Sequence, residues 1–210
     1  MGRSGGVSRG GRLTHRQRQA LETRRLIAEA AGRLFLERGY AATTMDAIAG
    51  EAGVAVSTVY AAFKNKRAIL KEIRLAWHDR TRAREINAEA AGQPDPERRL
   101  EMVAKANRRQ WELGAGLIAI YQGAAAADRE AAAELTEALG GRRAALDRVV
   151  EGMEKSLRPD LGAARAASIL RALCRPEVYQ ELVEESGWSP NEYESWLSET
   201  LKRELLAAQA

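Results

Sequence analysis

Apolar side chains recur every three or four residues along most of this chain, and no segment alternates apolar and polar residues as a half-buried strand does. Between Arg16 and Arg38 the pattern predicts one long helix, which Gly39 ends. Helical spacing returns from Lys66 and again from Leu100. We therefore predict an all-α fold.

Two short helices joined by a glycine turn are predicted between residues 43 and 63. Thr43 is a good N-cap, and Asp46 three residues later resembles the acidic member of a capping box. Gly53 stands where two crossing helices need a left-handed turn. Val59 and Phe63 anchor the second helix and leave its polar side chains facing outward. This pattern is typical of a helix-turn-helix, which presents one helix to DNA; the alternative is an ordinary helical hairpin in a larger bundle.

Breaks in the helical pattern divide the remainder of the chain. Asn65 is expected to cap a long helix that begins at Lys66 and fades before a linker at residues 92–96. We expect residues 140–141, both glycine, to separate two further helices, the second of which ends at Pro159.

Residues 22 to 70 resemble the N-terminal DNA-binding domain of the TetR (tetracycline-repressor) family of bacterial regulators. The resemblance implies an N-terminal three-helix helix-turn-helix DNA-binding domain plus a C-terminal helical ligand-binding and dimerisation domain. We expect a disordered basic tail over residues 1–15, the DNA-binding domain over 16–66 and the effector domain over 67–210. The matching residues are Ala31, Leu34, Phe35, Gly39, Tyr40, Thr43, Thr44, Ile48, Ala49, Ala52, Gly53, Val54, Thr58, Tyr60, Phe63 and Lys66.

The same resemblance implies which residues contact DNA. Phosphate contacts fall on hydroxyl and ammonium groups, and base contacts on the start of the second short helix. The chain departs from the family pattern at Ala55, Ser57 and Ala62, so thymine methyl contacts and one Ser57 hydrogen bond are the expected base readout. The implied DNA-binding residues are Thr43, Thr44, Ala55, Val56, Ser57, Thr58, Tyr60, Ala61, Lys64 and Lys66.

Basic charge is concentrated at the N-terminal end. Residues 1–80 hold 15 Lys or Arg against 7 Asp or Glu, whereas the whole chain holds 33 against 29. Such a distribution favours phosphate binding, although basic residues also simply solvate helical surfaces. The tail, with Arg3, Arg9 and Arg12, either enters a minor groove or is only solvated.

The last helix is predicted to begin at Pro190, with Ser189 as N-cap and Glu192 completing a capping box. Its apolar stripe, together with the preceding helix, is expected to form a homodimer interface, as the resemblance implies; the alternative is that both stripes pack within one subunit. The interface candidates are Leu170, Val178, Leu182, Tyr193, Trp196, Leu197, Leu201 and Leu205.

If the resemblance extends to mechanism, the helices between residues 97 and 158 enclose a pocket for a largely apolar effector, and effector binding shifts the two DNA-reading heads to a spacing wrong for DNA. Aromatic, thioether and amide side chains are the candidate lining. These candidates are Trp77, Met102, Asn107, Gln110, Trp111, Tyr121 and Met153.

Other functions find less support. Cys174 is the single cysteine, which excludes an intramolecular disulfide and fits a cytoplasmic protein, and no apolar run is long enough to cross a membrane. His15 and His78 are too isolated for a catalytic or metal site, so we expect no enzyme activity, no metal and no cofactor. The expected function is that of a ligand-responsive repressor of transcription, with an effector-independent architectural DNA-binding protein as the alternative.

Overall fold

The computed structural model describes residues 14–207 and confirms the all-α prediction. Within that range the only extended pairing is an isolated antiparallel bridge between Leu157 and Leu206. The predicted tail arginines Arg3, Arg9 and Arg12 lie outside the described residues. The helices are α1 His15–Arg38, α2 Met45–Ala52, α3 Val56–Ala62, α4 Lys66–Thr81, α5 Ala83–Gly92, α6 Pro96–Glu112, α7 Ala115–Ala127, α8 Arg129–Val150, α9 Ala163–Leu173, α10 Pro176–Tyr179 and α11 Pro190–Leu205, with a 3-10 turn at Glu154–Ser156 and a π-helix at Gln180–Glu185.

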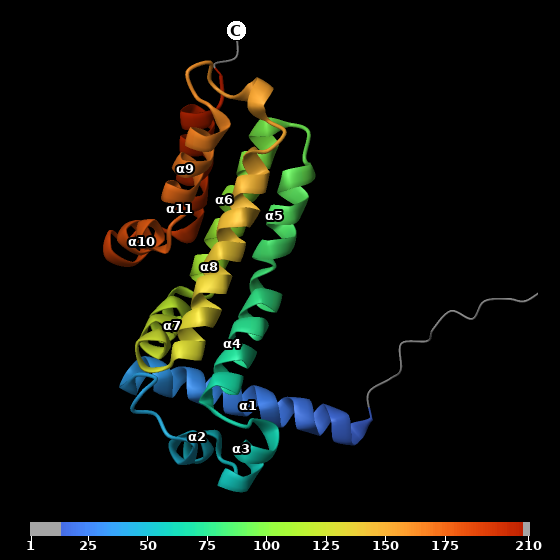
Figure 1. Cartoon of the computed structure of the whole chain (residues 1–210), viewed down its shortest axis with the longest axis vertical. Coiled ribbons are helices and arrows are strands. Elements are labelled where there is room, and N and C mark those ends of the chain that lie inside the picture. The colour runs from blue at the N-terminus through green and yellow to red at the C-terminus, as the bar shows by residue number, and fades with distance from the viewer. Residues whose placement is uncertain (1–13, 208–210) are drawn as a thin grey trace, which may run out of the picture.

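The helices form a small unit at one end of an elongated bundle (Figure 1). α1 runs across the end of the bundle and packs against α2, α3, α4 and α7. α4 and α5 follow one another along the long axis, and α6 and α8 lie beside them. α11 packs against α6 and α9 at the far side. α4 therefore runs from the small N-terminal unit into the bundle. In the described part of the chain, no helix combines the length and apolarity that crossing a bilayer requires.

One predicted helix cap is displaced by one residue, and those at Gly53 and Ser189 are confirmed. Thr44, not Thr43, is the N-cap of α2, and its hydroxyl accepts a hydrogen bond from the Ala47 amide at 3.1 Å. Gly53 has the predicted left-handed backbone, with φ of 67°, and its amide bonds back to the end of α2. Ser189 and Glu192 form the predicted capping box of α11, with distances of 3.2 and 2.8 Å.

Two predicted helix boundaries are wrong. α8 continues through Gly140 and Gly141 and ends at Val150, well before Pro159. Each internal glycine costs about 1 kcal/mol relative to alanine, but the buried residues on either side of the pair hold the helix together.

The helix that begins at Lys66 breaks at Arg82, which takes a left-handed backbone with φ of 50°. The break is stabilised by Arg109, whose Nε donates to the carbonyl of Thr81 at 2.9 Å.

The apolar stripe of α11 belongs to the core of one subunit. Tyr193, Leu197, Leu201 and Leu205 are each 0% exposed in the single chain, and so is Leu170 on α9. These five residues were predicted to face a partner subunit, and the structure contradicts that assignment. The error arose because a helix packed between α6 and α9 has the same apolar periodicity as one that pairs with a second subunit. Val178, Leu182 and Trp196 are half-buried.

Leu197→Ala should lower the free energy of unfolding by about 2 to 5 kcal/mol, since it removes buried apolar surface and leaves a cavity. Urea unfolding followed by circular dichroism measures the change. Ser195→Ala, at an exposed position of the same helix, should stay within about 0.5 kcal/mol of the parent. A Leu197→Ala variant of unchanged stability would contradict the burial.

Candidate nucleic-acid interface and internal cavity

The outer face of α3 is accessible at the end of the molecule (Figure 1). Val59 and Phe63 are buried, as predicted, and hold the inner face of α3 on α1 and α2. Tyr60 is 54% exposed, and Ser57 and Ala61 are exposed beside it. A short helix that presents hydroxyl and methyl groups outward has the geometry of a major-groove reader.

Arg24 fixes the end of α3, a role that the sequence pattern did not indicate. Its Nη1 donates to the carbonyl of Ala62 at 2.6 Å, and its Nη2 pairs with Glu72 of α4 at 2.6 Å. The guanidinium lies 4.1 Å from the centre of the Phe63 ring. Arg24 therefore joins α1, the end of α3 and α4 through one side chain.

Thr43 is not available for the predicted phosphate contact. Its side chain is 1% exposed, and its hydroxyl donates within the fold to the carbonyls of Leu34 and Gly39 at 3.2 and 2.8 Å. Thr44 is the exposed threonine of this pair. The Thr44 hydroxyl is therefore the accessible one, whereas the Thr43 hydroxyl is used to close the turn after α1.

Lys66 is half-buried at the start of α4. Its Nζ donates to the carbonyls of Tyr40 and Ala41 at 2.7 and 3.2 Å and lies 4.6 Å from the centre of the Tyr40 ring. Burial lowers the pKa of this ammonium group. Two of its three N–H donors are therefore occupied by the protein. Among the other predicted contacts, Ala55 and Lys64 are exposed, and Val56 and Thr58 are half-buried.

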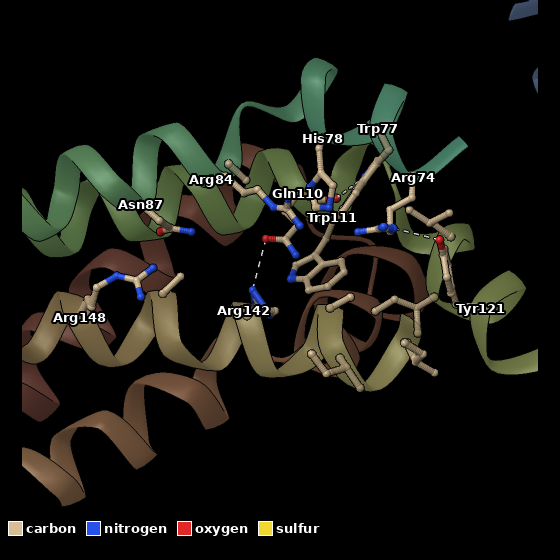
Figure 2. Close-up of a pocket in the computed structure, with 18 residues that line it drawn as sticks. Arg74, Trp77, His78, Arg84, Asn87, Gln110, Trp111, Tyr121, Arg142 and Arg148 are labelled. Atoms are coloured by element: carbon tan, nitrogen blue, oxygen red, sulfur yellow. Dashed lines mark hydrogen bonds between the residues drawn. The ribbon is translucent and has the colours of Figure 1, made fainter. Parts of the chain in front are cut away.

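A cavity of about 310 Å³ lies between α4, α5, α6, α7 and α8 (Figure 2). Four of the predicted residues line it: Trp77, Gln110, Trp111 and Tyr121. The remaining lining residues are Arg74, His78, Ala83, Arg84, Asn87, Leu117, Ile118, Leu135, Ala138, Leu139, Gly141, Arg142, Ala145 and Arg148.

Three predicted lining residues lie elsewhere. Met153 is buried in the core, and Met102 is half-buried on α6, outside the cavity wall. Asn107 is buried behind the wall, where its Nδ2 donates to the Tyr193 hydroxyl at 2.6 Å and its Oδ1 accepts from the Trp111 indole at 3.0 Å. The amide is therefore a support for the wall, since its hydrogen bonds orient Trp111.

Arg142 is the most enclosed of the four lining arginines. Its Nη1 donates to Oε1 of Gln110 at 3.3 Å, and its Nη2 donates to Oδ1 of Asn107 at 3.0 Å and to the carbonyl of Cys174. The guanidinium lies 4.9 Å from the centre of the Trp111 ring. Burial lowers its pKa. The arginines were missed because their charge suggested solvated positions, although Leu135, Ala138 and Arg142 follow helical spacing on one face of α8.

Two glycines allow the cavity wall to pack on α1 and α4. A Cβ on Gly114 would lie 1.8 Å from Nε1 of Trp77, and one on Gly116 would lie 3.0 Å from a methyl carbon of Leu36. The Trp77 indole donates to the carbonyl of Gln110 at 3.2 Å. The start of α7 can therefore lie against Trp77 because Gly114 carries no side chain, whereas a side chain at position 116 would require only a small shift of Leu36.

Residues 27–73, from α1 to the middle of α4, match the family model described as bacterial regulatory proteins, tetR family. Over these residues the chain matches the TetR family. Over 54 residues it is 44% identical to the uncharacterized HTH-type transcriptional regulator YhgD of Bacillus subtilis (strain 168). That match spans 26% of this chain and 28% of the curated relative. The predicted family is confirmed, with its N-terminal helix-turn-helix and C-terminal helical domain.

Solved structures share the fold of this chain over most of its length. A transcriptional regulator FadR from Bacillus subtilis, in complex with stearoyl-CoA, superposes with a TM-score of 0.61 and 22% identity, covering 84% of this chain and 96% of FadR. A protein from Saccharomonospora viridis described as a transcriptional regulator, in complex with choline, superposes with a TM-score of 0.67 and 21% identity, covering 90% and 100%.

Arg24→Met should lower the free energy of unfolding by about 1 to 2 kcal/mol, because it removes charge-assisted hydrogen bonds to Ala62 and Glu72. DNA affinity should fall as well, since the end of α3 loses its attachment. Urea unfolding and fluorescence anisotropy with labelled duplex measure the two effects. Arg25→Met is the matched control, because Arg25 pairs only with Glu22 and Glu29 of its own helix. Equal effects of the two substitutions would contradict the role of Arg24.

His78 should make stability depend on pH below neutrality. Burial, and then the guanidiniums of Arg84 and Arg74, lower the pKa of the imidazole from 6.5 to about 4. Between pH 6.5 and 4 the unfolded chain binds more protons, so stability falls as pH falls through this window and is unaffected by His78 above it.

The urea midpoint measured across this pH window tests the His78 prediction. His78→Gln should flatten the dependence, whereas His15→Gln, at an exposed position, should leave it in place. Identical pH profiles for the parent and His78→Gln would refute it.

Proposed function

We propose that this protein is a transcriptional repressor that binds operator DNA as a homodimer in the cytoplasm and leaves it when a small molecule occupies the cavity. The observation that carries the proposal is the outer face of α3, which is exposed at the end of the molecule while Val59 and Phe63 hold its inner face. The accessible set of DNA contacts is Thr44, Ala55, Val56, Ser57, Thr58, Tyr60, Ala61, Lys64 and Lys66.

α4 supplies the physical connection between the cavity and α3. Glu72 of α4 holds Arg24, which also holds the last residue of α3, while Trp77 and His78 further along α4 line the cavity. The start of α4 is tied to α8 through Arg67, whose Nη1 lies 3.8 Å from Asp128 and pairs with Glu130. A ligand that displaces Trp77 or His78 therefore moves the helix on which α3 is held. Effector binding and DNA binding are coupled if the effector binds more tightly to the protein with α4 displaced than to the protein with α4 in the DNA-binding position.

Two structural neighbours support an effector role for the cavity. The FadR structure holds stearoyl-CoA, and the structure from Saccharomonospora viridis holds choline. Proteins with this fold thus hold small molecules of very different size and charge. We infer that the cavity of this chain has the same role, with the 67–210 region as effector domain.

The homodimer interface is proposed on half-buried apolar residues, since the α11 stripe is used within the subunit. Ile169 and Leu173 of α9 and Trp196 of α11 are half-buried, and so are Val178 and Leu182 near α10. A dimer places two copies of α3 on half-sites about 34 Å apart, or further if the heads are splayed.

The alternative is an architectural DNA-binding protein that responds to no effector. A compound panel separates the two proposals. An effector raises the melting temperature progressively as its concentration increases above its Kd, and over the same concentration range it weakens DNA binding. The cavity, with its aromatic and cationic lining, favours the regulator.

Lys64→Ala should weaken binding to specific and random duplex alike, because its exposed ammonium group is expected to contact phosphate. The slope of log affinity against log salt should fall by about one unit. Fluorescence anisotropy over a range of salt concentrations measures this slope. Lys105→Ala, on the exposed side of α6, should leave both affinity and slope unchanged. An unchanged slope for Lys64→Ala would remove it from the contact set, and a parent protein indifferent to duplex DNA would overturn the proposed function.

A further inference from the structure

The internal cavity carries positive charge without matching carboxylates in its wall. Its lining includes Arg74, Arg84, Arg142 and Arg148, and no Asp or Glu. None of the four arginines forms an ion pair within residues 14–207. Arg74 and Arg142 are half-buried, whereas Arg84 and Arg148 are exposed to solvent as well as to the cavity. Guanidinium groups that lose part of their water are ordinarily paired with anions. The wall of this cavity therefore presents unmatched cations to whatever enters it.

Arg142 is a preorganised member of this set. It is bound only by neutral acceptors, namely the side-chain oxygens of Gln110 and Asn107 and the carbonyl of Cys174. These bonds and the Trp111 ring fix the plane of the guanidinium, so it loses little side-chain freedom when it binds an anion. They use three of its five N–H donors.

Arg84 and Arg148 face the same space from opposite walls (Figure 2). Arg84 extends from α5, and Arg148 follows Arg142 further along α8. Among the nearby carboxylates, Glu134 acts on Tyr121 near Arg74, and Asp79 and Glu85 act on His78. Glu177 acts on Arg142, but it forms its ion pair with Arg175 and is not part of the cavity lining. The end of the cavity between Arg84, Arg142 and Arg148 is thus its positive end.

Two further polar groups at the cavity lack partners within the described chain. Oδ1 of Asn87 has no hydrogen-bond partner, although the residue is only 8% exposed, and Nε2 of His78 has none either. Rotation of the Asn87 amide by half a turn presents its N–H groups instead, and a neutral imidazole with its proton on Nε2 is also a donor. Buried polar groups are normally satisfied, so both indicate a ligand with hydrogen-bonding oxygens.

The rest of the wall is apolar. Trp111, Leu117 and Ile118 line one part, and Leu135 and Leu139 of α8 line another. The volume of about 310 Å³ lies at the low end of ligand pockets, which span roughly 300 to 1,000 Å³. These dimensions favour a compact apolar body that carries one anionic group.

We propose that the cavity binds an amphipathic organic anion, with its charged group held by Arg84, Arg142 and Arg148 and its apolar body against Trp111 and the leucines of α8. This proposal rests on the proposed effector role of the cavity and names the chemical class of the effector. Carboxylate and phosphate ester share the required chemistry, since an arginine fork binds either with two parallel hydrogen bonds.

Calorimetry on the full-length protein with ten-carbon probes tests the charge preference. Decanoate, decyl phosphate, decan-1-ol and decyltrimethylammonium carry the same chain and differ in head group, and each is used below its micelle concentration. We expect decanoate or decyl phosphate to bind at least about tenfold more tightly than decan-1-ol, because charge-assisted hydrogen bonds are the stronger class. Whichever anion binds more tightly identifies the head group.

Arg84→Met carries the mutational test, because Arg84 lines the cavity, is exposed to solvent, and has no ion-pair partner in the described chain whose loss would unfold it. The ratio of anion affinity to decan-1-ol affinity, here called the anion advantage, should fall at least about threefold in this variant. The affinity for decan-1-ol itself should stay the same. Arg143→Met, which removes the same charge from an exposed position outside the cavity, should keep the full advantage. Arg142→Met should abolish the advantage in samples that still unfold cooperatively.

Equal affinity for decanoate, decyl phosphate and decan-1-ol would overturn the anion proposal, and so would an equal loss in Arg84→Met and Arg143→Met. Failure of all four probes to bind would also overturn it. None of these results bears on duplex binding by the free protein, which is measured separately by anisotropy. The anion proposal and the proposed DNA-binding function therefore fail on different measurements.

Discussion

The position of α4 depends on the packing of Trp77 against Gly114. The indole occupies the volume that any larger residue at position 114 would fill, and it donates to the carbonyl of Gln110 at 3.2 Å. This contact sets α4 against the junction of α6 and α7 and simultaneously forms one wall of the cavity. Because Trp77 is a single rigid side chain with both roles, the cavity cannot change shape at this point without moving α4.

Contacts along α4 then transmit its position to the helix-turn-helix. Lys66 binds the carbonyls that follow α1, Glu72 binds Arg24, and Arg24 binds the carbonyl that ends α3. Each contact is a hydrogen bond from a long cationic side chain, which tolerates small shifts better than close-packed apolar surface does. The buried core of Ile27, Phe35 and Val59 holds the three-helix unit as one body, so motion at α4 is expected to rotate that unit as a whole.

Sequence periodicity predicted the helices, Gly53 and the two capping residues of α11 because these features are local. It failed at Gly140–Gly141 because the burial of distant surfaces outweighed two weak helix formers. The α11 stripe was assigned to a partner subunit because periodicity identifies a buried face without identifying what covers it. Four of the seven predicted lining residues do line the cavity, and all four carry an aromatic ring or an amide. The arginines were not predicted, since only the tertiary fold brings Arg74, Arg84, Arg142 and Arg148 from three helices to one cavity.

Arg142 illustrates a general tension between stability and binding in such cavities. A buried guanidinium paired with a carboxylate would be locally satisfied, but it would have no charge left to offer a ligand. Held instead by the neutral oxygens of Gln110, Asn107 and Cys174, it keeps its hydrogen bonds and its orientation without an ion pair. Glu177, which pairs with Arg175, acts on this charge from outside the cavity lining. The ligand-free protein therefore already includes part of the cost of removing the Arg142 guanidinium from water, and this burial lowers the pKa of Arg142. We infer that an anion which relieves this penalty gains affinity from it. Because the same cavity wall contains Trp77 of α4, the proposed anion could use that gain to shift the helix that positions α3.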